Sequence, residues 1–251
     1  MLKLYKGDLL LFTNNGFKPA SEITDNDKLL VINNDGNLVF DEIEEITKTF
    51  KKKYKLNRID GYLINDNVEL YSLKNIPLDI EMSNLGEYLD NYHKNCIGFT
   101  KIGDLSTFDY YGFPTVKDDN SEMENPLFTL DMPITVLFGL NKKQLMAFYE
   151  SLLENNKEII ISTNEMSKYR VIKYLCLLLG VNASFQWKEG GMINVKIPKK
   201  INKYYYNHCN YNDNVWVKIR NIKKIQNYTG HLFYIKTKSG NPYISDVGVI
   251  S

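Results

Sequence analysis

The sequence predicts a mainly β protein that is interrupted by an inserted α+β unit. Short apolar runs separated by turn signals fill residues 1–110 of the 251-residue chain, which is typical of a compact all-β unit. The apolar spacing then becomes helical between residues 141 and 180,. Strand-like runs return from residue 211 to residue 251. The two ends can therefore complete one β core only if they meet in space.

The N-terminal β segment begins with GDLLLFTNNGFKPASEITDNDKLLVIN, residues 7–33. Two apolar runs, LLLF and LLVIN, flank the turn signal Asn14-Asn15-Gly16 and a short polar segment,. Further strands are predicted where apolar runs lie between turn signals, at residues 38–50, 53–56, 61–64 and 68–73. The residues that lead to CIGFTKI, at 96–102, predict an additional strand and a short helical turn.

The inserted unit is introduced by residues 108–132, whose two prolines and acidic cluster predict a loop or linker,. NKKQLMAFYESLLENN, residues 141–156, then places apolar side chains at helical spacing,. Asn141 is the predicted N-cap of this helix, because its side chain can accept a bond from a free amide of the first turn. EIIIS, residues 158–162, predicts a short strand after it.

A second helix is predicted over TNEMSKYRVIKYLCLLLG, residues 163–180. Thr163 or Asn164 would cap its start, and Gly180 fits the position after its end. ASFQWK and MINVKI, separated by Glu189-Gly190-Gly191, predict a hairpin,. The inserted unit is therefore expected to be helix, strand, helix and hairpin.

The C-terminal β segment is expected to hold three strand-like runs, at residues 215–226, 231–240 and 241–251, with turns at Tyr228-Thr229-Gly230 and Ser239-Gly240-Asn241. The predicted organisation is thus residues 1–110 and 211–251 as the two parts of one β domain, and residues 111–210 as the insertion.

Composition narrows the classes of protein further. Hydrophobic residues make up 43% of the chain and the net charge is +1, which fits a globular protein without a global basic field. No apolar run approaches the length of a membrane helix, and no secretion signal is visible. The three cysteines show no CxxC spacing, so we expect a soluble protein in a reducing intracellular setting. Abundant Asn, Lys and Tyr suggest an AT-rich genome, which is compatible with a virus, phage or mobile element.

Two motifs stand at the opposite ends of the chain. KGDLLLFTNNGFKPASEITDNDKLLVIN has an opening Gly-Asp and strand followed by a "dGf-kpi-eel-GD-vl" pattern, with Asn26-Asp27 in the place of the second Gly-Asp. TGHLFYIKTKSGNPYISDVGVIS has the shape "g-vYDl-v…nf-a-g-vvHN". Together these motifs resemble the Hint family of inteins and hedgehog autoprocessing domains. The resemblance covers roughly residues 4–107 and 211–251, and implies a Hint-like β domain.

That resemblance implies protein splicing, but the expected chemical groups are missing. A thiol or hydroxyl must attack the preceding carbonyl. The resemblance places this nucleophile at Leu4 or a near neighbour, and MLKLY contains no Cys, Ser or Thr. The family's Thr-x-x-His is matched best by Ser72 to Asn75, and a carboxamide does not titrate near neutral pH. Ser251 stands where the family has its terminal His-Asn, so asparagine cyclisation is not expected. The chain begins with Met1, so we expect no substantial upstream segment.

The inserted unit carries a second resemblance. FYESLLENNKEIIISTNEMSKYRVIKYLCLLLGV parallels "FLrGLfdaDGs…i…s…la…vq-lL..lGi", and resembles the LAGLIDADG (dodecapeptide) endonucleases that are often inserted into inteins. Only one such motif is visible. The resemblance puts Glu154 at the first acidic position and Asn156 at the metal-binding Asp. An amide brings no charge to a divalent cation, so we expect no metal site and no cofactor, with Mg²⁺ relevant only if the unit is active.

Basic and aromatic side chains alternate after the predicted hairpin. The residues selected as a candidate contact with double-stranded DNA are Lys196, Lys199, Lys200, Lys203 and Tyr204. Lysines can bind phosphates while aromatic rings stack on bases. The alternative interpretation is a solvated linker and strand surface in a chain rich in Lys and Asn.

The leading hypothesis is a catalytically degenerate Hint-like protein with a remnant LAGLIDADG-like insertion, retained as a structural or interaction module. No catalytic residue is expected, and the partners would be another protein in an assembly rather than a membrane. A second hypothesis is a DNA-binding or DNA-cleaving protein that acts through the insertion. A third is a partial splicing element that is completed by sequence beyond Ser251.

Overall fold

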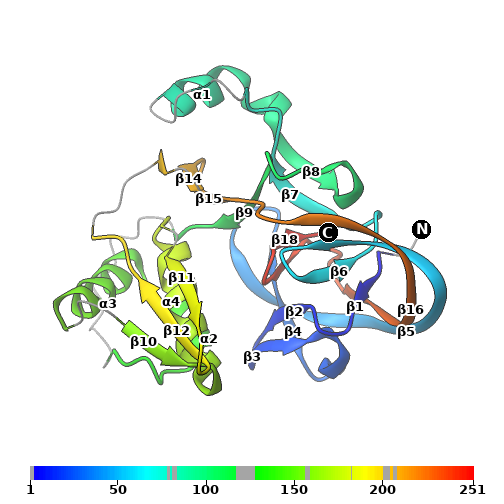
Figure 1. Cartoon of the computed structure of the whole chain (residues 1–251), viewed down its shortest axis with the longest axis horizontal. Coiled ribbons are helices and arrows are strands. Elements are labelled where there is room, and N and C mark those ends of the chain that lie inside the picture. The colour runs from blue at the N-terminus through cyan, green and yellow to red at the C-terminus, as the bar shows by residue number, and fades with distance from the viewer. Residues whose placement is uncertain are drawn as a thin grey trace. The chain divides into compact units, whose positions relative to one another are not determined.

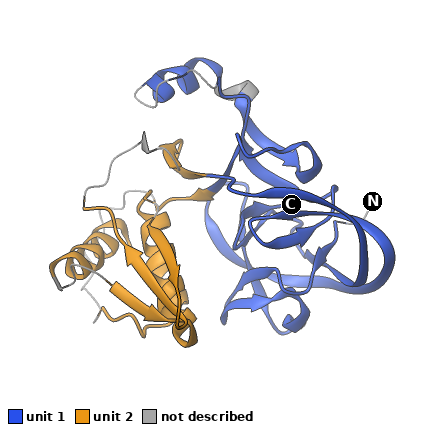
Figure 2. Cartoon of the chain, in the orientation of Figure 1, with its two compact units in different colours: residues 1–112, 218–251 blue, residues 113–217 orange. Residues whose placement is uncertain are grey.

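The computed structural model describes residues 3–77, 80, 84–116, 128–155, 159–181, 183–199, 204–205 and 208–251 (Figure 1), without the side chains of residues 93–95, 155 and 204–205. The protein is mainly β, and the chain divides into two compact units (Figure 2). The first unit comprises residues 1–112 and 218–251, and the second comprises residues 113–217. Both ends of the chain therefore contribute to the first unit.

The first unit is built mostly from antiparallel strands. Its elements are β1 (Tyr5–Lys6), β2 (Leu10–Thr13), β3 (Gly16–Pro19), β4 (Lys28–Ile32), β5 (Leu38–Ile59), β6 (Tyr62–Ile64), β7 (Glu69–Leu73), α1 (Leu85–Cys96), β8 (Ile97–Lys101), β9 (Tyr110–Pro114, which crosses the unit boundary), β16 (Ile222–Thr237), β17 (Tyr243–Ser245) and β18 (Gly248–Ile250). β1, from the start of the chain, lies between β16 and β6. β18, from the end of the chain, pairs with β7.

A long two-stranded ribbon of β5 and β16 dominates the first unit (Figure 1) and pairs from Ile43↔Thr237 to Ile59↔Ile222. The sequence predicted separate strands here, with a turn at Tyr228-Thr229-Gly230. That turn prediction is wrong, because pairing with β5 keeps β16 extended through register shifts on either side of Tyr228. Lys53, on the facing strand, takes a φ of 50°. Such irregularities bend a ribbon without ending it.

The opening turn signal is confirmed as a tight hairpin. β2 and β3 pair from Leu10↔Pro19 to Thr13↔Gly16, which leaves Asn14 and Asn15 as the loop. Gly16 has a φ of 91°, a conformation that glycine adopts without steric cost. The buried Thr13 hydroxyl donates to the Gly16 carbonyl over 2.8 Å and closes the turn.

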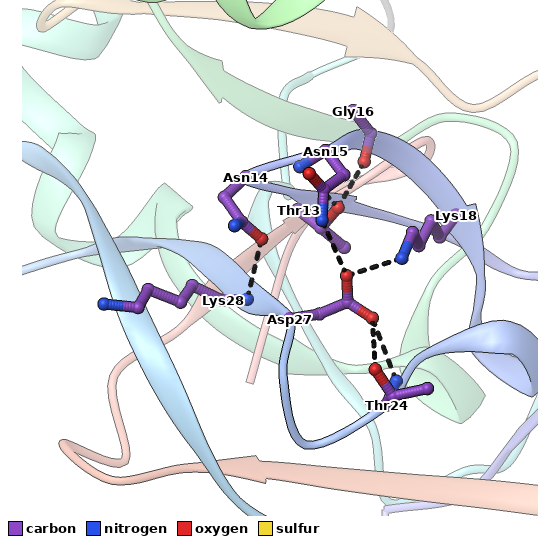
Figure 3. A network of polar contacts seen from close by, with 8 residues as sticks. All are labelled: Thr13, Asn14, Asn15, Gly16, Lys18, Thr24, Asp27 and Lys28. Atoms are coloured by element: carbon purple, nitrogen blue, oxygen red, sulfur yellow. Dashed lines mark hydrogen bonds and ion pairs between the residues drawn. The ribbon is translucent and has the colours of Figure 1, made fainter.

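A polar network holds the corner that follows this hairpin (Figure 3). Asp27 is only 2% exposed, and its carboxylate accepts bonds from Asn15, Lys18, and both the amide and hydroxyl of Thr24. Burial alone would raise the pKa of Asp27, but these bonds outweigh it and lower the pKa to about 2,. The Asp27 side chain therefore ties together three parts of the opening motif.

The core of the first unit draws on segments far apart in the sequence. Leu4, Leu56, Leu63 and Leu232 form a buried cluster that is covered by partly buried aromatic and aliphatic side chains, namely Tyr54, Ile225, Tyr228 and Tyr234. Burying such side chains is the main favourable term in folding. Leu4 is 2% exposed, so the position assigned to the nucleophile is a core position in this chain.

Helix α1 is longer than the short helical turn that the sequence predicted. It spans 12 residues, with Leu85 and Leu89 fully buried one turn apart. Side chains four positions apart lie on the same face of a helix, and this pair gives α1 a buried side.

The second unit combines helices with a small sheet. Its elements are α2 (Ile134–Leu137), α3 (Lys142–Asn155), β10 (Ile159–Ser162), α4 (Met166–Leu178), β11 (Ser184–Lys188), β12 (Met192–Lys196), β13 (Tyr204–Tyr205), β14 (His208–Tyr211) and β15 (Asn214–Lys218, which crosses the unit boundary). β12 lies between β10 and β11 in a three-stranded antiparallel sheet. α4 packs against α3 and β10. The predicted helix, strand, helix and hairpin are confirmed.

The predicted helix ends are confirmed in part. Asn141 caps α3, since its Oδ1 accepts from the Gln144 amide over 2.9 Å while the Gln144 side chain accepts from the Asn141 amide,. Gly180 follows α4 with a φ of 76°,. The start of the second helical segment differs, because Ser162 rather than Thr163 or Asn164 provides the capping box with Glu165. In the described part of the chain, no helix is both long and apolar enough to cross a membrane.

Candidate functional site

The position that the sequence assigned to the nucleophile lies beside Asn65. The Leu4 amide donates to Asn65 Oδ1 over 3.1 Å, and the Asn65 amide donates to the Leu4 carbonyl over 2.8 Å. Asn65 is 2% exposed. A buried carboxamide therefore holds the backbone of Leu4 in place from the turn between β6 and β7.

The end of the described chain meets the same region. The Ser251 amide donates to the Glu69 carbonyl over 3.0 Å, and the Glu69 amide donates to the Ser251 carbonyl over 3.1 Å. Lys3 Nζ donates to Ser251 Oγ over 3.1 Å and to Glu69 Oε2 over 3.2 Å. Lys3, next to Leu4, and Ser251 are thus joined directly, although they come from opposite ends of the first unit.

Two buried tyrosines belong to the strands beside this junction, Tyr5 to β1 and Tyr243 to β17. Their hydroxyls are 3.1 Å apart, and Tyr243 also donates to the Ile235 carbonyl over 3.4 Å. Burial is the main cause that raises the pKa of each phenol well above its usual value,. Burial therefore favours the neutral, protonated form of both phenols.

A hollow of about 390 Å³ adjoins the junction. It is lined by Lys3, Tyr234, Ile235, Lys236, Thr237, Gly240, Asn241, Tyr243 and Ser251. The lining of the hollow therefore offers two ammonium groups, hydroxyls, an amide and backbone groups around an open space.

Neither a cysteine nor a histidine lines this hollow among the residues that the structure describes. All three cysteines are buried, and Cys176 and Cys209 belong to the second unit, where burial raises the pKa of each thiol to about 12. Cys96 ends α1, and burial raises its pKa as well. His231 is exposed on β16 and lies edge-on to Phe50. The described residues contain no group of three His, Cys, Asp or Glu side chains that could hold a metal ion.

The other positions assigned to splicing lie elsewhere. Ser72 is fully buried in β7, and its hydroxyl bonds to the Gly98 carbonyl and to Thr100 Oγ1 over 3.2 and 2.8 Å. Asn75 follows β7 with a φ of 59°, and its carbonyl accepts from the Tyr88 hydroxyl over 3.4 Å. Neither residue is the one that holds the Leu4 backbone.

Sequence reasoning missed Asn65. The signal that could have found it is spacing, because Asn65 and the buried Val68 stand three positions apart, as Thr and His do in Thr-x-x-His. Neither residue type matches that motif, so the alignment of Asn65 with the motif's Thr became apparent only from the contact of Asn65 with Leu4.

The residues singled out in the second unit are described only in part. Glu154 is exposed near the end of α3, and Asn156 lies outside the described residues. Lys196 and Lys199 are exposed at and beyond the end of β12. Lys200 and Lys203 lie outside the described residues. Tyr204 belongs to β13 and pairs with Cys209 through the backbone.

The solved structures that this chain resembles include crystal structures of two mutants of the Ssp DnaB mini-intein variant M86. A double mutant aligns with a TM-score of 0.42 and 9% identity, over 100% of this chain and 93% of that chain. A single mutant aligns with a TM-score of 0.43 and 10% identity, over 99% of this chain and 97% of that chain. No protein-family model and no curated protein matches the sequence.

Proposed function

We propose that this chain is an intein-like (Hint-like) protein that has lost self-splicing and is retained as a structural or interaction module. The observation that carries the proposal is the junction at which Lys3 bonds to Ser251 while Leu4 is held by Asn65. Splicing requires the two ends of the domain to lie together, because the acyl group passes from the N-terminal splice site to the C-terminal one. This junction supplies that proximity.

The side chains at the junction argue against acyl transfer from its N-terminal side. Leu4 carries only an alkyl group, which cannot attack a carbonyl. The Tyr5 phenol is fully buried, and its raised pKa keeps it protonated. The Asn65 amide can hold a backbone group but cannot deliver a proton to a leaving nitrogen near neutral pH. Proximity therefore remains without the first nucleophile or a general acid.

The packing of Leu4 in the core supports the role as a structural or interaction module. Leu4 packs with Leu56, Leu63 and Leu232, so the former site contributes to the core. Replacing a reactive side chain with a buried aliphatic one adds apolar burial to the fold. This change favours a structural or interaction role, which depends on the stable fold and not on a reactive side chain.

The experiment is a fusion of the chain between two well-folded carrier proteins. The fusion is incubated with and without a small thiol, and the products are read by intact mass. We expect the fusion to remain intact, whereas an active mini-intein between the same carriers is cleaved or spliced. A Leu4→Cys variant, which restores a thiol, tests whether the nucleophile alone is missing. Site-specific cleavage of the unaltered chain at either junction would show that the proposal is wrong.

A second candidate function is DNA binding by the second unit as a remnant LAGLIDADG-like domain. It is favoured by the order of α3, β10, α4 and the β11–β12 hairpin, and by exposed lysines on the hairpin strands and beyond, namely Lys188, Lys196 and Lys199. We expect no Mg²⁺-dependent cleavage, because Asn156 replaces the metal-binding carboxylate that the resemblance implies. Gel-shift assays with random duplexes, with and without Mg²⁺, test both statements. Absence of salt-sensitive binding by the intact chain would eliminate this candidate.

A further inference from the structure

A strongly basic segment occupies the part of the β5–β16 ribbon that ends at the Ile59↔Ile222 pair. We define the basic ribbon as residues 47–59 of β5 together with residues 222–231 of β16. It contains six basic residues on the first strand and two on the second: Lys48, Lys51, Lys52, Lys53, Lys55 and Arg58, and Lys223 and Lys224. Neither stretch contains Asp or Glu. The net charge of the whole chain, +1, does not reveal this local positive charge, because acidic residues elsewhere balance it.

The positive charge of the basic ribbon is exposed and uncompensated. Seven of the eight basic residues are exposed, and Lys51 is partly buried. Within the described part of the chain, none of the eight forms an ion pair. At the other end of the ribbon the lysines form ion pairs: Lys236 of β16 pairs with Glu44, and Lys238, directly after β16, pairs with Glu42. Unpaired basic side chains therefore lie along one part of the ribbon, and ion-paired lysines lie at its other end.

The arrangement costs stability within the ribbon. Lys223 lies directly across from Arg58 in the strand register, and like charges at facing positions repel each other. Lys51, Lys52 and Lys53 follow one another on β5. The core does not depend on these basic side chains, because most of them are exposed to solvent. An anionic partner would remove the repulsion.

The basic ribbon packs on the core through one face, which carries Tyr54, Leu56, Ile225 and Tyr228, and is two-stranded over most of its length. β6 pairs with β5 only at residues 57–59, and β1 pairs with β16 only at Leu232 and Phe233. Between these points, in the described part of the chain, each strand of the ribbon has the other as its only strand partner. A two-stranded antiparallel ribbon fits the major groove of B-form DNA. Phe50 is 51% exposed at this stretch and offers an apolar contact beside the lysines.

We propose that the basic ribbon binds duplex DNA, with its lysines on the phosphates and its two-stranded segment in the major groove. The inference goes beyond the proposed function and does not depend on it, because the ribbon charges are unrelated to the loss of splicing groups. A-form RNA has a major groove too narrow for this element, so duplex DNA is the preferred partner. The site also differs from the lysines of the second unit considered above.

The test is fluorescence anisotropy of the full chain with a labelled random-sequence DNA duplex, over a salt series. The ribbon variant is Lys52→Gln, Lys55→Gln, Lys223→Gln and Lys224→Gln, all exposed positions. The control variant removes the same number of charges at exposed positions outside the basic ribbon and outside the lysines of the second unit named above, through Lys28→Gln, Lys101→Gln, Lys143→Gln and Lys236→Gln. Circular dichroism and thermal unfolding of both variants check that the fold is unchanged.

The proposal predicts that the ribbon variant loses affinity by roughly 100-fold at low salt, and that its slope of log K against log salt falls by about 3 to 4. The control variant should keep most of its affinity and nearly the parental slope. A Phe50→Ala variant should bind more weakly without a change of slope. The proposal is overturned if the ribbon variant binds like the parent, or if the control variant is the one that loses binding. Equal affinity for duplex RNA, or binding to phosphatidylserine vesicles without binding to DNA, would also overturn it.

Discussion

Lys3 Nζ donates a hydrogen bond of 3.1 Å to Ser251 Oγ, which joins residues 248 positions apart. The same ammonium group contacts Glu69 Oε2 over 3.2 Å. The backbone of Ser251 also pairs with Glu69 through two hydrogen bonds of 3.0 and 3.1 Å. The junction between the two ends of the first unit is thus held by both side-chain and backbone contacts.

The side-chain part of this junction should contribute little to stability. The Lys3 and Glu69 side chains are 34% and 32% exposed, and solvated ion pairs contribute at most about 1 kcal/mol. A Lys3→Met variant should therefore lower the free energy of unfolding by less than about 1 kcal/mol in urea denaturation. A Lys6→Met variant, which breaks the exposed pair with Asp8, is the matched control. A large loss in the Lys3 variant alone would mean that the ion pair, and not the backbone pairing, secures the junction.

Asn65→Ala should have a much larger effect. The substitution removes the acceptor of the buried Leu4 amide, and leaving a buried donor without its partner costs about 1–3 kcal/mol. Urea denaturation measures this loss, and hydrogen exchange at the Leu4 amide should become faster. Asn91→Ala, at an exposed position in α1, provides the control. Unchanged exchange at Leu4 would contradict the role assigned to Asn65.

Asp27 should make the first unit sensitive to acid. The folded pKa is about 2, against an ordinary value of 3.8. In acid the unfolded chain takes up the proton first, so the stabilisation is complete above the ordinary pKa and is lost as the pH falls from about 5 to about 2. The shift corresponds to about 2 kcal/mol. In circular dichroism at a series of pH values, Asp27→Asn should be less stable than the parent near neutrality and should show a flatter decline in acid. Asp35→Asn, at an exposed turn position, should follow the parent.

His208 should make the second unit sensitive to a milder range of pH. The side chain is 1% exposed, and burial lowers its pKa from 6.5 to about 4. Below pH 6.5 the unfolded chain binds a proton that the folded chain does not, so stability falls as the pH drops from about 6.5 to about 4. The expected loss between neutrality and pH 5 is about 2 kcal/mol.

Tryptophan fluorescence during urea unfolding can follow this loss, because Trp187 and Trp216 both belong to the second unit. His208→Gln should remove most of the pH dependence in that range, whatever its effect on stability at neutrality. His231→Gln, on the exposed face of β16, is the control. An equally steep pH dependence in the His208 variant would show that another group titrates.

Local patterns in the sequence were sufficient for much of the fold. The Asn14-Asn15-Gly16 hairpin, the Asn141 cap of α3 and the Gly180 end of α4 were all predicted, because each depends on a few adjacent residues. The helix, strand, helix and hairpin of the second unit followed from side-chain periodicity in the same way. The absence of Cys, Ser and Thr from Met1–Tyr5 is also a property of the sequence alone.

The long ribbon could not be predicted in this way. The segment Tyr228-Thr229-Gly230 carries the residue types of a turn, but β5 supplies extended partners on both sides of it. Long-range pairing overrides local turn preference when the backbone bonds are satisfied across the strands. The distribution of charge along the ribbon became visible only when residues 47–59 and 222–231 were placed side by side.

The sequence by itself therefore determined which chemical groups the chain possesses and most of its local elements. The tertiary structure decided which groups meet: Asn65 with Leu4, 61 positions away, and Ser251 with Lys3, 248 positions away. The physical reason is that contacts over such separations are selected by the packing and hydrogen bonding of the whole unit, and no local propensity encodes them.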